Sequence, residues 1–362
     1  MANPTVRLSK ELIAIRTDPS NTRELHEALK LVERELKGFP LERFERNKSR
    51  SILVMNTKRR PKKFRVLLNG HLDVIPGKDF QYIPREKGGR LYGVGSMDMK
   101  SNVACLIQAF KQTARKVSYP LGLQIVTDEE VGGFDGTLYQ VERGVRADFV
   151  IAGESTRFDI VNEAKGILWI KISCRGKTAH GAYPWRGDNA IAKMNICLSR
   201  LMEEFPVPKS QVWRSTINIS RVETSNSSFN KVPDSCQAWI DLRFIPSESK
   251  TILKRFRSAL PKGCSVEIIA HEPALYVDKR DPYLVRLRAI TQTVTGQPAK
   301  YYGAQGSSDA RHFTRVGCAG VEFGPIGGGI GTDKEWVSIP SLMKYENILR
   351  EFLLSLNSST DV

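Results

Sequence analysis

The sequence lacks any long apolar run. No stretch approaches the roughly eighteen uninterrupted apolar residues that a transmembrane helix requires. The first residues, MANPTVRLSKEL, are too polar for a secretory signal peptide. We therefore expect a protein of the cytoplasm, without a membrane partner.

Cysteine is sparse and widely spaced. No two cysteines form a CxxC pair, so the pattern predicts neither a thiolate zinc site nor a redox motif. Most of them lie inside apolar segments and are expected to be small buried hydrophobic side chains. The six are Cys105, Cys174, Cys197, Cys236, Cys264 and Cys318.

The sequence also lacks repeats, low-complexity segments and nucleic-acid recognition motifs. Its net charge is +16, but the charges are spread along the chain apart from the basic run at 58–63. That run lies between apolar segments and is expected to be a solvated loop. An RNA-associated function would rest on net charge alone, and we expect no nucleic-acid partner.

The first half of the chain alternates helix and strand patterns. With 362 residues and 41% hydrophobic side chains, the chain is long enough for two domains. A helix is expected over 22–37, with Asn21 and Glu24 resembling a capping box. Short apolar runs predict buried strands at 66–68, 123–126 and 149–151. The alternation indicates a three-layer α/β domain with a mostly parallel sheet.

Between about 166 and 275 the predicted order of elements changes to strand, helix, two strands, helix and strand. This is the order of a ferredoxin-like α+β unit. Its first helix is expected over 188–205, with Asp188 as N-cap. One stripe of that helix carries Ile191, Met194, Leu198, Leu201 and Phe205. The alternating helix and strand pattern resumes at about 280. We therefore expect a catalytic domain formed by 1–165 and 280–362, with a second domain, 166–279, inserted between these two parts.

Acidic and imidazole side chains cluster where strands are expected to end. His71 and Asp73 follow one strand, the acidic run 128–130 follows another, and Glu154 follows a third, while Asp98 precedes a helix. The carboxyl ends of parallel strands meet at one crevice, so these groups can converge. Each cluster alone is weak evidence for a functional site, but clusters at several successive strand ends are stronger evidence.

Carboxylates crowded at one crevice would repel one another without a cation, which indicates a divalent metal. Imidazole together with carboxylates suits zinc. One carboxylate can also bridge two ions about 3.5–4 Å apart, as in two-metal hydrolases.

Motifs along almost the whole chain resemble those of the zinc aminoacylase/carboxypeptidase family, which includes succinyl-diaminopimelate desuccinylase, acetylornithine deacetylase and di- and tripeptidases. The matching segments, in family order, are GHLDVIPG (70–77), LYGVGSMDMK (91–100), TDEEVGG (127–133), AGEST (152–156), GKTAHGAYPWRGDNAI (176–191), NKVPD (230–234), DLRF (241–244), GSSDARHF (306–313) and FGPIGGG (323–329).

The resemblance implies a zinc centre. His71 and Glu154 would bind one ion, Asp98 would bridge two ions, and Glu130 would bind the second. Asp73 would accept the other ring N–H of His71 and so orient it. Manganese or cobalt could substitute for zinc.

The resemblance also implies the reaction. Glu129 would be the general base that takes a proton from a metal-activated water and returns it to the leaving amine. His180, from the inserted domain, would stabilise the oxyanion. In several members this imidazole comes from a partner subunit, so a homodimer through 166–279, the lid and dimerisation domain, is expected.

Substrate contacts are implied for Arg243, Asn230, Ser307, Ser308 and Arg311. An arginine suits bidentate binding of a carboxylate. Arg243 fits almost equally well as an ordinary outward residue of an alternating strand.

The chain departs from the family pattern at Gly331. The family has a metal-ligand histidine four residues before the glutamate that is Glu335 here, and glycine offers no ligand. Asp333 or His312 could replace it, the second ion could be weakly bound with water, or only the first site could be filled. His312 could equally be a buried packing residue. A weakened or re-liganded second site is favoured, and a carboxylate replacement would favour manganese.

The leading hypothesis is a metal-dependent hydrolase that cleaves an amide bond of an N-acyl amino acid or small peptide. The alternative is a catalytically silent binding protein, which Gly331 alone supports. Glu129 and His180 argue against it, because a binder needs no general base.

Overall fold

The computed structural model describes residues 3–261 and 263–358 and divides them into two compact units. The first unit comprises the described residues of Met1–Glu163, Tyr276–Tyr302 and Ser308–Val362. The second comprises those of Ala164–Leu275 and Gly303–Ser307. Among the described residues, no helix is long and apolar enough to cross a membrane.

The main sheet has the strand order β1-β2-β6-β3-β7-β15-β8-β13, with β14 paired to β8. Its central strands β6, β3, β7 and β15 run parallel, whereas β1 and β2 join one side antiparallel. The predicted mostly parallel sheet is confirmed. The strands are β1 (Leu41–Arg46), β2 (Ser49–Met55), β3 (Phe64–His71), β6 (Leu121–Val126), β7 (Ala147–Ala152), β8 (Ile160–Ala164), β13 (Leu275–Tyr276), β14 (Tyr301–Ala304) and β15 (Ala319–Glu322).

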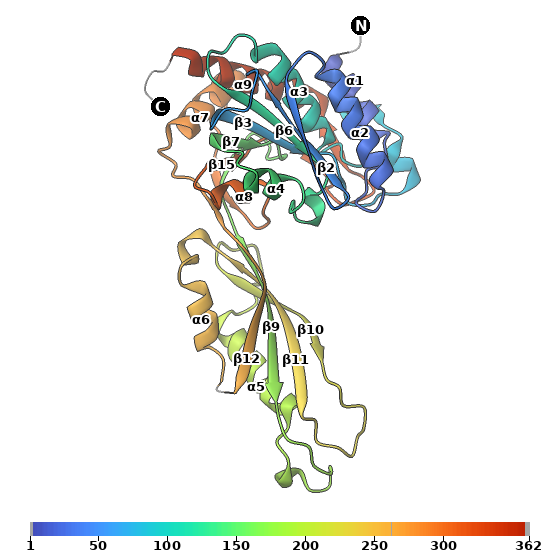
Figure 1. Cartoon of the computed structure of the whole chain (residues 1–362), viewed down its shortest axis with the longest axis vertical. Coiled ribbons are helices and arrows are strands. Elements are labelled where there is room, and N and C mark those ends of the chain that lie inside the picture. Colours follow the sequence, from blue (N-terminus) through green and yellow to red (C-terminus); the bar gives the residue numbers. More distant parts are fainter. Residues whose placement is uncertain (1–2, 262, 359–362) are drawn as a thin grey trace. The chain divides into compact units, whose positions relative to one another are not determined.

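Helices cover both faces of this sheet (Figure 1). Adjacent residues of β3 point to opposite faces, so Leu68 joins one buried cluster and Leu67 the other. The larger cluster includes side chains of α1 (Pro4–Ile13), α2 (Thr22–Glu35), α3 (Lys100–Thr113), α7 (Pro282–Thr295) and α9 (Ile339–Ser355). The smaller cluster includes side chains of α4 (Thr137–Glu142) and α8 (Ala310–Thr314). Two apolar layers around one sheet give the three-layer architecture expected from the sequence.

A small antiparallel sheet with the order β16-β17-β5-β4 belongs to the same unit. Its strands are β4 (Arg85–Lys87), β5 (Arg90–Tyr92), β16 (Gly327–Gly328) and β17 (Trp336–Ser338). The pairing of β17 with β5 places Glu335 close to the segment that leads to Asp98.

The second unit has the ferredoxin-like order of elements and an antiparallel sheet, β10-β11-β9-β12. This confirms the predicted α+β fold. Its elements are β9 (Gly166–Arg175), α5 (Ala190–Glu204), β10 (Thr216–Glu223), β11 (Ser235–Phe244), α6 (Ile252–Ser258) and β12 (Cys264–Glu272).

The predicted helix caps need correction. The α5 N-cap is Asn189 rather than Asp188, because the Asn189 side chain accepts the backbone N–H groups of the first turn. Asn21 does precede α2, but its side chain makes no cap hydrogen bond. Of the stripe predicted for this helix, α5, Met194, Leu201 and Phe205 are buried and Leu198 packs against the same cluster, but Ile191 is exposed.

Candidate metal centre

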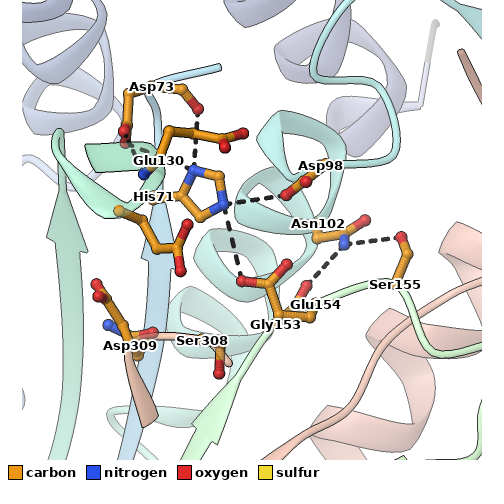
Figure 2. A network of polar contacts seen from close by, with 12 residues as sticks. His71, Asp73, Asp98, Asn102, Glu130, Gly153, Glu154, Ser155, Ser308 and Asp309 are labelled. Carbon is orange, nitrogen blue, oxygen red and sulfur yellow. Dashed lines mark hydrogen bonds and ion pairs between the residues drawn. The ribbon is translucent and has the colours of Figure 1, made fainter. Parts of the chain in front are cut away.

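His71, Asp98 and Glu154 converge in the first unit. His71 is the last residue of β3, a central strand between β6 and β7. Its Nε2 lies 3.1 Å from Asp98 Oδ1 and 3.7 Å from Glu154 Oε1 (Figure 2). One ligand atom from each residue lies within 4.8 Å of the others. The side chains predicted from the strand ends therefore meet in space.

Asn102 links the segments that carry the two carboxylates. It lies in α3, whose start follows Asp98, and its amide nitrogen donates to the Gly153 carbonyl at 2.6 Å and to Ser155 Oγ at 3.0 Å (Figure 2). Those two residues flank Glu154. Asn102 is completely buried, so these bonds are shielded from water. Sequence reasoning did not identify this residue.

Glu335 holds the Asp98 loop from the other side. Its carboxylate accepts backbone N–H groups from Gly95 at 3.1 Å, Met97 at 2.8 Å and Asp98 at 3.1 Å. Burial nonetheless raises the pKa of Glu335 to about 7, against the lowering effect of these bonds. Sequence reasoning used Glu335 only to mark a motif, whereas the structure gives it a positioning role.

Asp73 connects His71 to Glu130. The Nδ1 of His71 lies 2.9 Å from the Asp73 carbonyl oxygen and 3.5 Å from its carboxylate. The other carboxylate oxygen accepts the Glu130 N–H at 2.8 Å. The shorter contact to His71 is thus made by the backbone of Asp73, not by its side chain as expected. A ring N–H fixed at Nδ1 leaves Nε2 as the atom that can bind a metal.

The charges at this centre favour a bound cation. Burial raises the pKa of Glu154 well above its usual range, and the nearby charge of Asp98 raises it further. Burial lowers the pKa of His71, but hydrogen bonds to Asp73 and Asp98 outweigh it and raise the pKa well above its ordinary value. The rise for Glu154 comes mainly from burial and the rise for His71 from its carboxylate neighbours, and a divalent ion would stabilise the charged carboxylates at this centre. One imidazole and two carboxylates fit a catalytic site with an open fourth position.

Glu129 and Glu130 lie in a single turn of 3-10 helix, η2 (Glu129–Val131), after β6. Burial raises the pKa of Glu129 well above its usual range, while the charges of His71 and Arg311 lower it. Glu130 lines a cavity of about 240 Å³ together with Asp98 and Gly331.

Neither candidate replacement for the missing histidine joins the centre. Asp333 forms an ion pair with Lys78 at the rim of the same cavity. His312 Nε2 lies 3.0 Å from the Gly132 carbonyl, and burial together with Arg311 lowers the pKa of His312 to about 2. Within residues 3–261 and 263–358, only His71, Asp98 and Glu154 form a group of three or more metal-ligating side chains.

Arg311 is buried beside the proposed base. Its guanidinium donates to the Ser308 carbonyl at 2.8 Å and to the Gly132 carbonyl at 2.6 Å. It also lies 3.9 Å from Glu129 Oε1. These contacts join α8 to the turn after η2. The predicted role of Arg311 in substrate binding stays a prediction.

Three predicted substrate contacts, Asn230, Arg243 and Ser307, belong to the second unit together with His180, whereas Ser308 belongs to the first. His180 and Asn230 are exposed in the second unit, and the His180 ring accepts the Ala182 N–H at 3.1 Å. Arg243 makes a bidentate ion pair with Asp241 at 2.8 and 3.1 Å, as an ordinary strand residue can. Ser307 closes the segment Gly303–Ser307 of this unit. The substrate roles of these side chains stay predictions.

The fold and the centre together define a two-unit protein with a mostly parallel α/β sheet and a candidate metal centre, and comparisons give its family. Residues 67–355 match the model of peptidase family M20/M25/M40, so the chain belongs to this family. A succinyl-diaminopimelate desuccinylase of Bordetella petrii is 28% identical over 80% of this chain and 82% of its own length. A desuccinylase of Caulobacter sp. is 27% identical over 92% of each chain.

Solved structures share the fold. The aminopeptidase PepT of Bacillus cereus superposes with a TM-score of 0.77 at 18% identity, covering 98% of each chain. The M20 metallo-carboxypeptidase Sso-CP2 of Sulfolobus solfataricus gives 0.75 at 16% identity, covering 97% of this chain and 99% of its own.

Family membership makes this chain a metal-dependent hydrolase of amide bonds. The alternative of a catalytically silent binding protein is not favoured.

Glu335 provides a test of the positioning network. We expect Glu335→Ala to weaken zinc binding by about 10–100-fold, because the loop that carries Asp98 loses three acceptor contacts. Glu335→Gln keeps one acceptor oxygen and should lose less. Chelator competition on the metal-free protein measures the affinity, and Glu351→Gln at an exposed surface ion pair is the control. Unchanged affinity in Glu335→Ala would contradict the positioning role.

Proposed function

We propose that this chain is a cytoplasmic zinc enzyme that hydrolyses the amide bond of an N-acyl amino acid or small peptide next to a carboxylate. The names of its relatives, which are desuccinylases, support an acyl-amino acid substrate. The observation that carries the proposal is the convergence of His71, Asp98 and Glu154, with the half-buried acid Glu129 in the turn after β6.

Metal binding and proton transfer are assigned to different residues. His71, Asp98 and Glu154 would hold the ion, which when bound supplies Lewis acidity for water and carbonyl oxygen. Glu129 takes a proton from the attacking water and returns it to the leaving amine nitrogen. Its position is fixed through η2, whose Glu130 N–H donates to Asp73. The Arg311 bond to Gly132 holds the residue that follows η2.

The Glu129→Gln substitution tests the proton transfer. It keeps the size of the side chain but removes the base, so we expect hydrolysis to fall about 10²–10⁴-fold. Release of free amine from N-succinyl amino acids, N-acetyl amino acids and dipeptides measures the rate, and mass spectrometry checks that zinc content is unchanged. Glu142→Gln, at an exposed ion pair of α4, is the control. Full activity in Glu129→Gln would refute the assignment.

We further propose that the centre is asymmetric, with one firmly held ion and a second site that is at most weak. Glu130 faces the cavity beside Gly331, where the family's histidine is absent. Asp333 is paired with Lys78, and His312 lies against the Gly132 carbonyl. This arrangement favours a weakened second site over a re-liganded one.

Metal content after dialysis tests the asymmetry. We expect about one zinc per chain in the natural protein, and up to two in Gly331→His, because imidazole restores a ligand opposite Glu130. Gly331 has φ +66°, so a side chain there costs about 1–2 kcal/mol. Gly331→Ala carries the same strain without a ligand and is the matched control. Two tightly held zinc ions in the natural protein would overturn this proposal.

We also propose a homodimer through the second unit. Strand β10 lies at the edge of its sheet and most of its side chains are exposed. Helix α5 exposes Ile191, Ile196 and Met202. Unpaired edges and apolar side chains of this kind favour association. Light scattering during size exclusion should give about twice the chain mass of 40.7 kDa. A single-chain mass at all concentrations would contradict the dimer.

A further inference from the structure

Four of the six cysteines gather at one end of the second unit's sheet. Cys174 in β9 pairs in register with Cys236 in β11 on one side and with Cys264 in β12 on the other. Residues directly opposite in antiparallel strands point to the same face. Cys197 of α5 belongs to the same buried cluster. Residues up to 90 positions apart in sequence thus bring four thiols together.

Two of these thiols are in contact. The sulfur atoms of Cys174 and Cys264 lie 3.0 Å apart. Directly opposed residues of antiparallel strands have Cα atoms about 4.5–5.5 Å apart, which lies inside the range of about 4.4–6.8 Å found for disulfides. Formation of a bond between them therefore needs only small side-chain movements.

Solvent access differs among the four. Cys264 is half-buried, whereas Cys174, Cys197 and Cys236 are buried. Burial raises the pKa of Cys174 to about 12, and contact with Cys264 adds to this rise. Cys174 therefore stays protonated at neutral pH, and an oxidant in solution meets Cys264 first.

We propose that Cys174 and Cys264 are a redox modification site that closes to a reversible cross-strand disulfide in the presence of a peroxide. The Cys264 thiolate attacks the peroxide oxygen, becomes a sulfenic acid and releases hydroxide, which takes up a proton as water. The Cys174 sulfur then attacks the Cys264 sulfur and forms the disulfide. The hydroxyl group leaves and takes the Cys174 proton as a second water. Two thiols are oxidised, and one hydrogen peroxide is reduced.

The disulfide would join β9 to β12, the central and an edge strand of the sheet. The loop that it closes spans most of the second unit, so the unfolded chain loses conformational freedom. Oxidation should therefore raise the melting temperature, and reduction by a dithiol should reverse the rise. This site is independent of the metal centre and of the proposed substrate.

Intact mass and peptide mapping test the site on the full metal-loaded chain. After hydrogen peroxide treatment we expect the mass to fall by about 2 Da. Two of the six thiols should become unreactive towards iodoacetamide after denaturation. A peptide pair that links Cys174 to Cys264 should appear and vanish on treatment with a dithiol.

Matched variants separate the pair from its neighbours. Cys264→Ala, at the half-buried position, should show neither the mass loss nor the rise in melting temperature, whereas Cys236→Ala keeps the pair and should show both. Oxygen adducts on Cys264 without a link, a link between Cys197 and Cys264, or six reactive thiols after treatment would each overturn the proposal.

Discussion

Buried negative charge at the carboxyl edge of the parallel sheet is the constraint on which this structure depends. Asp98 and Glu154 approach one nitrogen of the buried His71 ring, at 3.1 and 3.7 Å, and their side chains are each only 18% exposed. Low local polarity strengthens their mutual repulsion, so the arrangement is unfavourable without a cation. The fold must therefore hold the two carboxylates in place until the ion binds. An ion bound to the native state would then offset their repulsion. An ion that binds the native state alone would for this reason also stabilise the fold.

That support comes from segments far apart in sequence. Glu335 fixes the backbone that leads to Asp98, and Asn102 joins the start of α3 to the residues that flank Glu154. Asp73 fixes the ring of His71 through its carbonyl and the turn of Glu130 through its carboxylate. These bonds form only when β3, β7, α3 and the small sheet have assembled. The centre is thus a property of the complete first unit rather than of any single motif.

The centre could be predicted from the sequence because the end of an apolar run marks the end of a buried strand, and parallel strands bring their carboxyl ends together. His71 and Glu154 were found in this way and Asp98 as the acid before a helix, while the resemblance to the family implied their roles as ligands. Hydrogen bonds between side chains and backbone groups were not predicted, because sequence patterns do not show which carbonyl or N–H a side chain will reach. The cap of α5 is Asn189 for that reason, although Asp188 is equally suited by residue type.

Charge balance explains why the proposed asymmetric centre would suffice. One divalent ion offsets the two carboxylates of Asp98 and Glu154, while a neutral imidazole adds a ligand without adding charge. The charge of Asp333 is already offset by Lys78. Asp333 and Glu335 also line this cavity, but Glu335 accepts three backbone N–H groups, so a second dication would rely on Glu130 and a share of Asp98. The proposed reaction needs one Lewis acid and one base, so a glycine at position 331 would weaken the second site without removing a chemical role from the first.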